Sequence, residues 1–274
     1  ISQQIAGLER AVGDRVFDRP GGPKRVELTP TGVLLLDYAT SVFEQLRITE
    51  DGLRSLRAGE VGRLVVGSFQ SVSVNVLPAV VGRLRGERPG LAVRCEEEDE
   101  NDVLVGRLLA DELDLTFLIG EPDDPAVESV TLLVDPFVLV SPNTGIAPVV
   151  DPGRLGGVAM IGQSPCACQL SIDRALRDLG VEPDYVFRTN DNAAVQAMVR
   201  AGMGCAILPH LAVDRTDPGV VVSTMDPPIA PRVLVLARRK GRTLPPAAER
   251  FIELAQAVCA LLQLPEHQPA RAGV

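Results

Sequence analysis

The sequence predicts an α/β protein in which a short N-terminal segment and one long helix precede two lobes of alternating strands and helices. Three observations support this prediction. Residues 1–29 read as a helix followed by a tight turn and a short strand. Residues 30–58 repeat apolar side chains in steps of four and three. Between about residues 61 and 264, short apolar runs alternate with amphipathic segments.

The first segment combines a helix with a small hairpin. Apolar residues spaced by three and four give one buried helical stripe, formed by Ile5, Leu8, Val12 and Val16. The run PGGP at 20–23 predicts a turn, and residues 26–29 predict an extended return strand. A helix followed by such a hairpin has the shape of a winged helix-turn-helix, here a partial one. We expect the cations at the hairpin tip to contact phosphates rather than bases.

The long helix begins at the run LTPTG. Thr29 suits the N-cap, and Pro30 suits the first helical position, where no amide hydrogen is needed. A heptad seam follows, made by Leu35, Ala39, Val42, Leu46, Thr49, Leu53 and Leu56. A seam this narrow favours pairing with another helix, so residues 30–58 are predicted to dimerise. An ordinary amphipathic helix lying on a core is the alternative.

The third region predicts two lobes joined where Pro and Asp cluster, at VDPF (134–137) and MDPPIAP (225–231). The first lobe then comprises 61–134 and 230–264, the second 135–229, and 265–274 form a tail. The predicted strands are RLVVGSF, LAVRCEE and LDLTFLIG, the last with Leu113, Leu115, Phe117 and Ile119 toward one face, and then 136–141, 157–161, 185–189, 205–208, 219–224 and 232–237. The predicted helices are 74–86, NDVLVGRLLADE, 168–179, 191–201 and 246–262.

Charge and composition limit the function classes. Five basic and four acidic side chains give residues 1–29 a net charge of +1. Because the formal net charge of the whole chain is −9, the remaining residues carry −10. An acidic body repels nucleic acid, which confines any DNA contact to the N-terminal end. The sequence contains no window of ~18 uninterrupted apolar residues, so no membrane span is predicted. The five cysteines do not form a secreted disulfide framework. We therefore expect a cytoplasmic protein.

The N-terminal stretch ISQQIAGLERAVGDRVFDR…VELTPTG has the pattern S-x-x-I-x-x-L-E-x-x-x-G-x-x-x-F-x-R followed by L-T-x-x-G. This pattern resembles the LysR-type transcriptional regulators. The phrases GRLVVGSF, LDLTFLIG and VRAGMGCAILP also resemble that family. The resemblance implies a dimerising linker helix and a two-lobed, periplasmic-binding-protein-like effector domain. It also implies that residue 1 lies inside the DNA-recognition helix, so we expect this chain by itself to bind DNA poorly.

The resemblance implies that the intact protein binds double-stranded DNA and indicates which residues contact it. Base edges would be read by Ser2, Gln3 and Gln4, because glutamine can read adenine with two hydrogen bonds. Phosphates would be bound by Arg19, Lys24 and Arg25 in the wing. A solvated helix face and a basic turn are the alternative for these residues.

A small-molecule effector is expected between the lobes, where strands end and helices begin. Three loops qualify: SFQSVS (68–73), GQSPCAC (162–168) and RTNDN (188–192), with Asn190 or Asp191 as a helix cap. Helix N-termini favour a carboxylate or similar anion, so an anionic metabolite is predicted. Plain capping is the alternative for each polar residue. The candidate effector-binding residues are Ser68, Phe69, Gln70, Ser71, Gln163, Ser164, Cys166, Asn190 and Met203.

The remaining motifs favour no catalyst. Cys166 and Cys168 permit redox or metal sensing, but no histidine cluster supplies zinc-like spacing. The acidic run 96–102 lacks the pattern of a calcium loop and reads as a solvated strand end. No catalytic or cofactor motif is present, so we predict no enzyme activity, metal or cofactor. The chain is predicted to be an effector-responsive homo-oligomeric regulator, dimer or tetramer. Its rivals are a solute-binding protein without DNA function and an α/β enzyme with Cys166 as nucleophile.

Overall fold

The computed structural model describes residues 2–18, 26–57, 60–143 and 148–262. Two compact units divide the chain, Ile1–Ala58 and Gly59–Val274. None of the helices in the described ranges has both the length and the apolar character that crossing a bilayer requires.

The first unit contains a helix, a two-stranded hairpin and a long helix: α1 Ser2–Val12, β1 Phe17–Asp18, β2 Glu27–Leu28 and α2 Pro30–Arg57. β1 and β2 pair antiparallel, with Phe17 opposite Leu28. Thr29 is the N-cap of α2, because its Oγ1 accepts a hydrogen bond from the Gly32 amide at 3.0 Å. The Thr29 hydroxyl also donates to the Arg15 carbonyl at 2.6 Å, which fastens the start of α2 to the end of the first loop.

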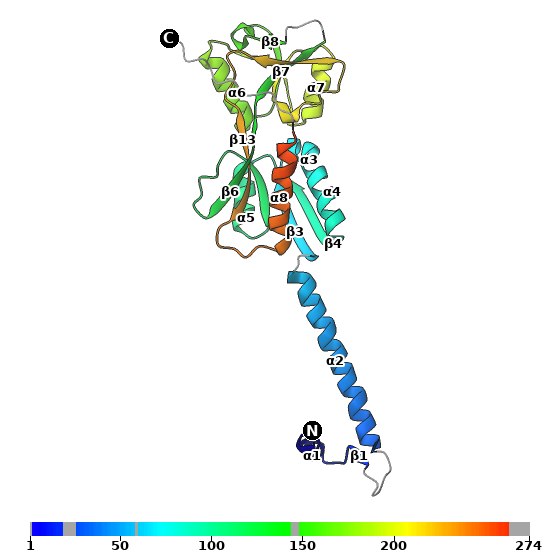
Figure 1. Ribbon diagram of the computed structural model, residues 1–274. Coiled ribbons are helices and arrows are strands. Elements are labelled where there is room, and N and C mark those ends of the chain that lie inside the picture. Colours follow the sequence, from blue (N-terminus) through cyan, green and yellow to red (C-terminus); the bar gives the residue numbers. More distant parts are fainter. Residues whose placement is uncertain (1, 19–25, 58–59, 144–147, 263–274) are drawn as a thin grey trace. The chain divides into compact units, whose positions relative to one another are not determined.

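Gly32 explains the glycine of the LTPTG run. A Cβ added at this position would lie 2.1 Å from the carbonyl oxygen of Val16. The backbone of α2 therefore approaches the loop after α1 more closely than any side chain allows. Beyond this junction α2 is one uninterrupted helix (Figure 1), and its seam residues Val42, Leu46 and Leu53 are 40%, 53% and 49% exposed.

The second unit opens with a five-stranded sheet in the order β4-β3-β5-β13-β6. β3 runs parallel to β4 and β5, whereas β13 runs antiparallel to β5 and β6. Their bounds are β3 Val61–Ser68, β4 Gly90–Glu97, β5 Leu115–Ile119, β6 Val127–Asp135 and β13 Arg232–Arg239. This sheet and its helices form the first lobe.

Helices cover both faces of this sheet: α3 Gln70–Asn75, α4 Leu77–Glu87, α5 Asn101–Leu109 and α8 Pro246–Ala260. α4 and α8 lie side by side on one face (Figure 1). One core gathers Leu64, Phe117 and Phe251, and the core on the other face gathers Val65, Leu104 and Leu118. Three of the four residues expected on one face of this strand, Leu115, Phe117 and Ile119, pack in the first core as predicted, whereas Leu113 lies before β5 and packs in the second. Leu118 also packs in the second core, so both faces of β5 are buried.

The second lobe is built on β11-β7-β12-β8, beside which β9 and β10 pair in parallel. A parallel bridge between Met160 and Cys205 joins the two groups of strands. The elements are β7 Phe137–Pro142, β8 Val149–Val150, β9 Ala159–Gly162, α6 Ala167–Asp178, β10 Asp184–Arg188, α7 Asn192–Arg200, β11 Ala206–Pro209 and β12 Val220–Met225, with 3₁₀ turns at Pro152–Arg154 and His210–Ala212. The chain passes between lobes at Pro136 and again between β12 and β13.

Two further expectations differ from the structure. The helix predicted over 74–86 begins earlier, at Gln70, and is interrupted at Val76. Pro78 lies in the first turn of α4 and has no amide hydrogen to continue the hydrogen bonds of α3. The strand β6 was not predicted, because it lies at the sheet edge and most of its side chains are only half-buried, so its sequence lacks an apolar alternation.

Candidate functional site

The two lobes enclose a hollow of about 380 Å³, called here the cleft hollow. The first lobe contributes the segments after β3 and β4 and the last residue of β5, and the second contributes the segments after β9 and β10. Six of the nine predicted effector residues line it: Phe69, Gln70, Ser71, Gln163, Cys166 and Asn190. The volume lies within the range of small-molecule sites, about 300–1,000 Å³.

Gln70 connects the lobes from the start of α3. Its Oε1 accepts a hydrogen bond from the Asn192 amide at 2.8 Å, and its Nε2 lies 3.4 Å from Oδ1 of Asp191. Asp191 caps α7 by accepting from the amides of Ala193 and Ala194. The first turn of α7 is therefore already satisfied by protein groups, which leaves little for an incoming anion at this helix end.

The loop after β9 is fixed by hydrogen bonds from four sides. Gln169 accepts from the Gln163 amide at 2.7 Å, and Asn190 accepts from the Ser164 amide at 3.1 Å. The Gln163 side chain donates to Oδ1 of Asn192 at 2.9 Å, and Arg188 donates to the Gln163 carbonyl at 2.7 Å. This loop therefore presents Gln163 to the cleft hollow in a defined orientation.

A buried network anchors that loop from below. Nε2 of Gln169 donates to Oδ1 of Asp173 at 2.7 Å, and the Tyr185 hydroxyl donates to the same oxygen at 2.5 Å. Burial raises the pKa of Tyr185, and the Asp173 carboxylate acts in the same direction. Gly162 is required beneath this network, since a Cβ there would come within 2.7 Å of the Tyr185 ring.

Arg232 lies where the chain returns to the first lobe, and its side chain is only 6% exposed. Nε and Nη2 both donate to Oδ2 of Asp135 at 2.8 Å. Nη2 also donates to Oγ of Ser71 at 2.8 Å, and the guanidinium carbon lies 5.4 Å from the centre of the Phe69 ring. Arg232 thus ties both crossing segments to the start of α3, and it lines the cleft hollow.

The acidic end of the cleft hollow comes from residues 99–102. Asp99, Glu100 and Asp102 line it, and Glu98 accepts hydrogen bonds from the amides of Asp99 and Glu100. Partial burial raises the pKa of Asp99, and the neighbouring carboxylates of residues 97, 98 and 100 act in the same direction. An opposing hydrogen bond comes from Asn190 of the other lobe.

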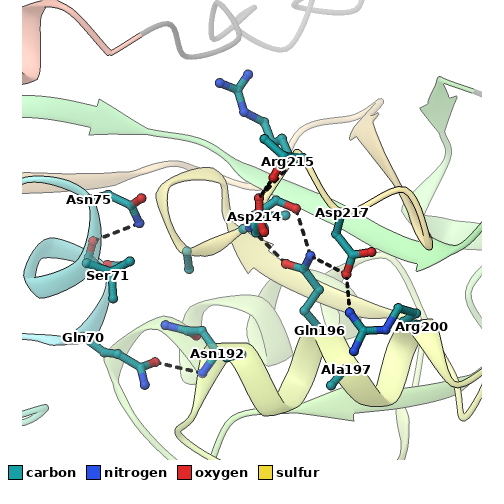
Figure 2. Close-up of a pocket in the computed structure, with 15 residues that line it drawn as sticks. Gln70, Ser71, Asn75, Asn192, Gln196, Ala197, Arg200, Asp214, Arg215 and Asp217 are labelled. Atoms are coloured by element: carbon teal, nitrogen blue, oxygen red, sulfur yellow. Dashed lines mark hydrogen bonds and ion pairs between the residues drawn. The ribbon is translucent and has the colours of Figure 1, made fainter.

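A larger hollow of about 620 Å³, called here the side hollow, lies between α3, α7 and residues 212–217 and shares Gln70, Ser71 and Asn192 with the cleft hollow. Its polar groups bind one another (Figure 2): Gln196 donates to the Asp214 carbonyl at 2.8 Å, and Arg200 pairs with Asp217 at 2.8 Å. The polar lining is therefore used for structure, and the cleft hollow is the better candidate site despite its smaller volume.

Three predicted residues do not line the cleft hollow in the described structure. Ser68 is buried, and its hydroxyl lies 2.8 Å from that of Ser73. Ser164 contributes its backbone amide to the loop. Met203 is 42% exposed and follows the C-terminal end of α7, whereas Asn192 at the other end lines the hollow. The nine-residue helix keeps the two ends about 13 Å apart, so the structure does not group Met203 with the cleft residues.

The sequence reasoning missed Arg232, Asn192 and the acidic end as cleft residues. Arg232 is the cation of the APR run beside a predicted crossing, and its partner Asp135 belongs to the other crossing. The opposite charges of these two residues, each beside a predicted crossing between the lobes, could have indicated that they pair.

The cysteines of the cleft have little thiolate character. Burial raises the pKa of both Cys166 and Cys168, although Arg232 lies 3.8 Å from the Cys168 sulfur. A reactive sensor thiol needs the opposite shift. Among the described residues, no group of three or more His, Cys, Asp or Glu side chains is placed to hold a metal ion.

In the first unit, α1 exposes Gln3 and Gln4. Ser2 begins this helix, and its side chain lies outside the described structure, as do the predicted wing cations Arg19, Lys24 and Arg25. The described strands β1 and β2, which pair antiparallel, flank these cations in the sequence.

Comparison with known proteins gives one family. Residues 57–260 match the model of the LysR substrate binding domain. YbhD of Escherichia coli K12, an HTH-type transcriptional regulator, is 25% identical over 259 residues, which cover 93% of this chain and 81% of that protein. The DNA-binding transcriptional dual regulator OxyR of the same organism is 26% identical over 268 residues, covering 94% and 85%.

A solved structure shows the same fold. The crystal structure of full-length CbnR complexed with its target DNA superposes with a TM-score of 0.71 at 21% identity and covers 94% of this chain and 88% of that one. The relatives matched in sequence are transcriptional regulators and not enzymes. Because the family model spans well over half of the 274 residues, the chain belongs to the LysR family of transcriptional regulators.

Proposed function

We propose that this LysR-family regulator binds double-stranded DNA through its N-terminal unit and a small-molecule effector in the cleft hollow, as a homodimer or homotetramer. The observation that carries the proposal is the cleft hollow itself. Loops far apart in sequence converge on it from both lobes, and the loop after β9 is held in place by a dedicated hydrogen-bond network.

The effector site uses the polar side chains that face the cleft hollow. Gln70, Gln163 and Asn190 provide directional hydrogen bonds, while Phe69 provides an apolar wall. Arg232 and the start of α6, where no side chain caps the helix, suit a carboxylate on the effector. This arrangement supports the anionic part of the sequence prediction but not an effector that is wholly anionic.

Self-association occurs along α2. Val42, Leu46 and Leu53 are exposed within the described unit and follow the heptad spacing of a coiled coil. Leaving such a stripe in water is unfavourable, by roughly 25 cal/mol for each Å² of apolar surface. A second copy of the helix removes this surface from water and pairs two DNA-contacting units.

DNA is contacted by α1 and the hairpin. Gln3 and Gln4 read base edges, Ser2 lies beside them, and Arg19, Lys24 and Arg25 supply phosphate contacts. The acidic remainder of the chain keeps nucleic acid away from the lobes. Because its target is genomic DNA, the protein works in the cytoplasm.

Effector binding acts on DNA through the contact between lobes. A ligand that favours the arrangement in which Gln70 bonds to Asn192 shifts the population toward it, by no more than its difference in affinity between arrangements. That shift changes how paired subunits hold their two DNA-contacting units.

The test starts from selection of genomic fragments that the full-length protein binds. A gel shift then compares a selected fragment with its shuffled version over a series of salt concentrations. We expect a preference for the selected fragment, lost in a Gln3→Ala/Gln4→Ala variant, and an affinity that falls with salt. No preference at any salt concentration would refute DNA regulation. Gln163→Ala serves as the matched cleft variant and should bind DNA but lose its response to effector.

A further inference from the structure

The cleft hollow carries an uneven charge. Asp99, Glu100 and Asp102 line it, and Arg232 is the cation among the described lining residues. The guanidinium of Arg232 is also already paired with Asp135, which lies behind it. A ligand bearing negative charge alone would therefore meet an excess of carboxylates.

Within the part of the chain that the structure describes, the carboxylates at the acidic end have no basic partner. In the described ranges, no arginine, lysine or histidine forms an ion pair with Asp99, Glu100 or Asp102, whereas Glu96 nearby pairs with both Arg94 and Arg107. Glu98 holds the backbone of residues 99 and 100 in place, and Asn101 is bound to both backbone groups of Ile119 at 2.7 and 3.2 Å. The backbone that carries these three exposed carboxylates is thus fixed at the hollow, and within the described ranges no cation compensates their charge.

The opposite chemistry is present at Arg232. Nε and Nη2 are taken by Asp135 and Ser71, but the only partner of Nη1 in the described structure is the Cys168 thiol at 3.8 Å. A thiol is a weak acceptor, so this buried nitrogen retains the capacity to donate to an oxygen of a ligand. The start of α6 at Ala167 adds backbone amides, and the described structure shows no side-chain cap hydrogen bond from Cys166 to them.

We propose that the cleft hollow binds a small zwitterion of the amino-acid type. Its ammonium group lies against the carboxylates of Asp99, Glu100 and Asp102, and its carboxylate accepts from Nη1 of Arg232. The inference rests on the proposed effector site and specifies its ligand class. The pKa of Asp99, raised by burial and by neighbouring carboxylates, supports it, because an ammonium group relieves that repulsion.

The side hollow does not share this chemistry. Asp217 is paired with Arg200, and Asp214 accepts from both the amide and the hydroxyl of Thr216 (Figure 2 shows the first pair). Among the described residues, the carboxylates of the side hollow thus have hydrogen-bond or ion-pair partners of their own, whereas no ion pair involves Asp99, Glu100 or Asp102 at the cleft hollow.

The experiment measures binding of matched probes to the full-length protein. The twenty common L-amino acids are screened by thermal shift at millimolar concentration beside a set of mono- and dicarboxylates. Each amino acid that raises the midpoint is compared by calorimetry with its 2-hydroxy acid, which lacks the ammonium group, and with its decarboxylated amine. We expect at least one amino acid to bind, and both analogues to bind about 10- to 100-fold more weakly.

Variants locate the ammonium group. Asp99→Asn and Glu100→Gln should weaken binding of the amino acid about tenfold or more while leaving the 2-hydroxy acid unchanged or tighter. Glu182→Gln replaces an exposed carboxylate that does not line the hollow; this variant is the control and should change the affinity for neither compound. Circular dichroism spectra and melting midpoints of the variants establish that each is folded.

The outcomes separate this inference from the proposed function. If the 2-hydroxy acid binds as tightly as the amino acid, or if carboxylates bind and no amino acid does, the ligand class is wrong. If the affinity for such a carboxylate falls in the Gln163→Ala variant, the proposed effector site is supported although the amino-acid ligand class is refuted. If no compound of any charge binds and Gln163→Ala leaves DNA binding and its regulation unchanged, the effector site itself is refuted.

Discussion

Replacing Asp135 by Asn should strongly destabilise the second unit. The substitution keeps the volume and an acceptor for the Leu211 amide, which donates to Oδ1 at 3.0 Å. It removes the carboxylate that accepts from Nε and Nη2 of Arg232 at 2.8 Å each. Arg232 then stays buried without a counter-charge, and the expected loss is about 3–5 kcal/mol in the free energy of unfolding.

The assay is urea unfolding followed by circular dichroism at constant pH. With a slope of about 2–3 kcal/mol per M, a loss of about 4 kcal/mol lowers the midpoint by roughly 1.3–2 M. The double variant Asp135→Asn/Arg232→Met keeps the acceptor for the Leu211 amide, removes both charges and should be more stable than Asp135→Asn. A loss below about 1 kcal/mol for Asp135→Asn, or a double variant less stable than the single one, would contradict the reasoning.

Three other predictions concern separate parts of the chain. Gly32→Ala should destabilise the start of α2, because the new Cβ would collide with the Val16 carbonyl. Gly52→Ala, at a position on the same helix with open space around it, should stabilise the helix by up to about 1 kcal/mol. Amide hydrogen exchange measured separately at the two positions distinguishes these effects. Burial lowers the pKa of His210, so the unfolded chain takes up a proton below about pH 6.5 more readily than the folded chain. The contribution of His210 to stability is therefore complete above that pH and is lost as pH falls below it, and wild type should lose more stability between pH 7 and 5.5 than His210→Leu; equal losses would exclude this role. Because burial raises the pKa of Cys166, its alkylation by iodoacetamide at pH 7.5 should be slower than that of free glutathione, as followed by mass spectrometry, and faster alkylation would restore the case for a redox sensor.

Local patterns predicted most of the secondary structure, because each relevant periodicity is contained in one short window. The strand expected at 205–208 runs Ala206–Pro209, and the helix expected at 191–201 runs Asn192–Arg200. Elements without such periodicity were not predicted: β6 lies at a sheet edge, and α3 is a six-residue helix that ends before Pro78. Their form is decided by neighbours that a short window does not contain.

The candidate site was predictable to the extent that it depends on strand ends. Gln70 and Gln163 follow strands, and six of the nine expected residues line the cleft hollow. The rest depends on closure of one lobe on the other. The partners Gln70 and Asn192 are separated by 122 residues, and Arg232 and Asp135 by 97, so no local pattern relates them. The prediction of an anionic ligand did not take Asp99 into account, because the acidic run was interpreted as a solvated strand end; the nature of the ligand stays a prediction.

The position of β13 has a consequence for the order in which the chain matures on the ribosome. This strand lies between β5 and β6, yet it is made after the whole second lobe. The inserted lobe can therefore complete its strands while its host still lacks a central one, and the unfinished host displays two open strand edges until residue 239 emerges. A chain that stops between the end of β12 and the start of β13 therefore carries all the strands of the second lobe, whereas its first lobe exposes two strand edges that are prone to aggregation.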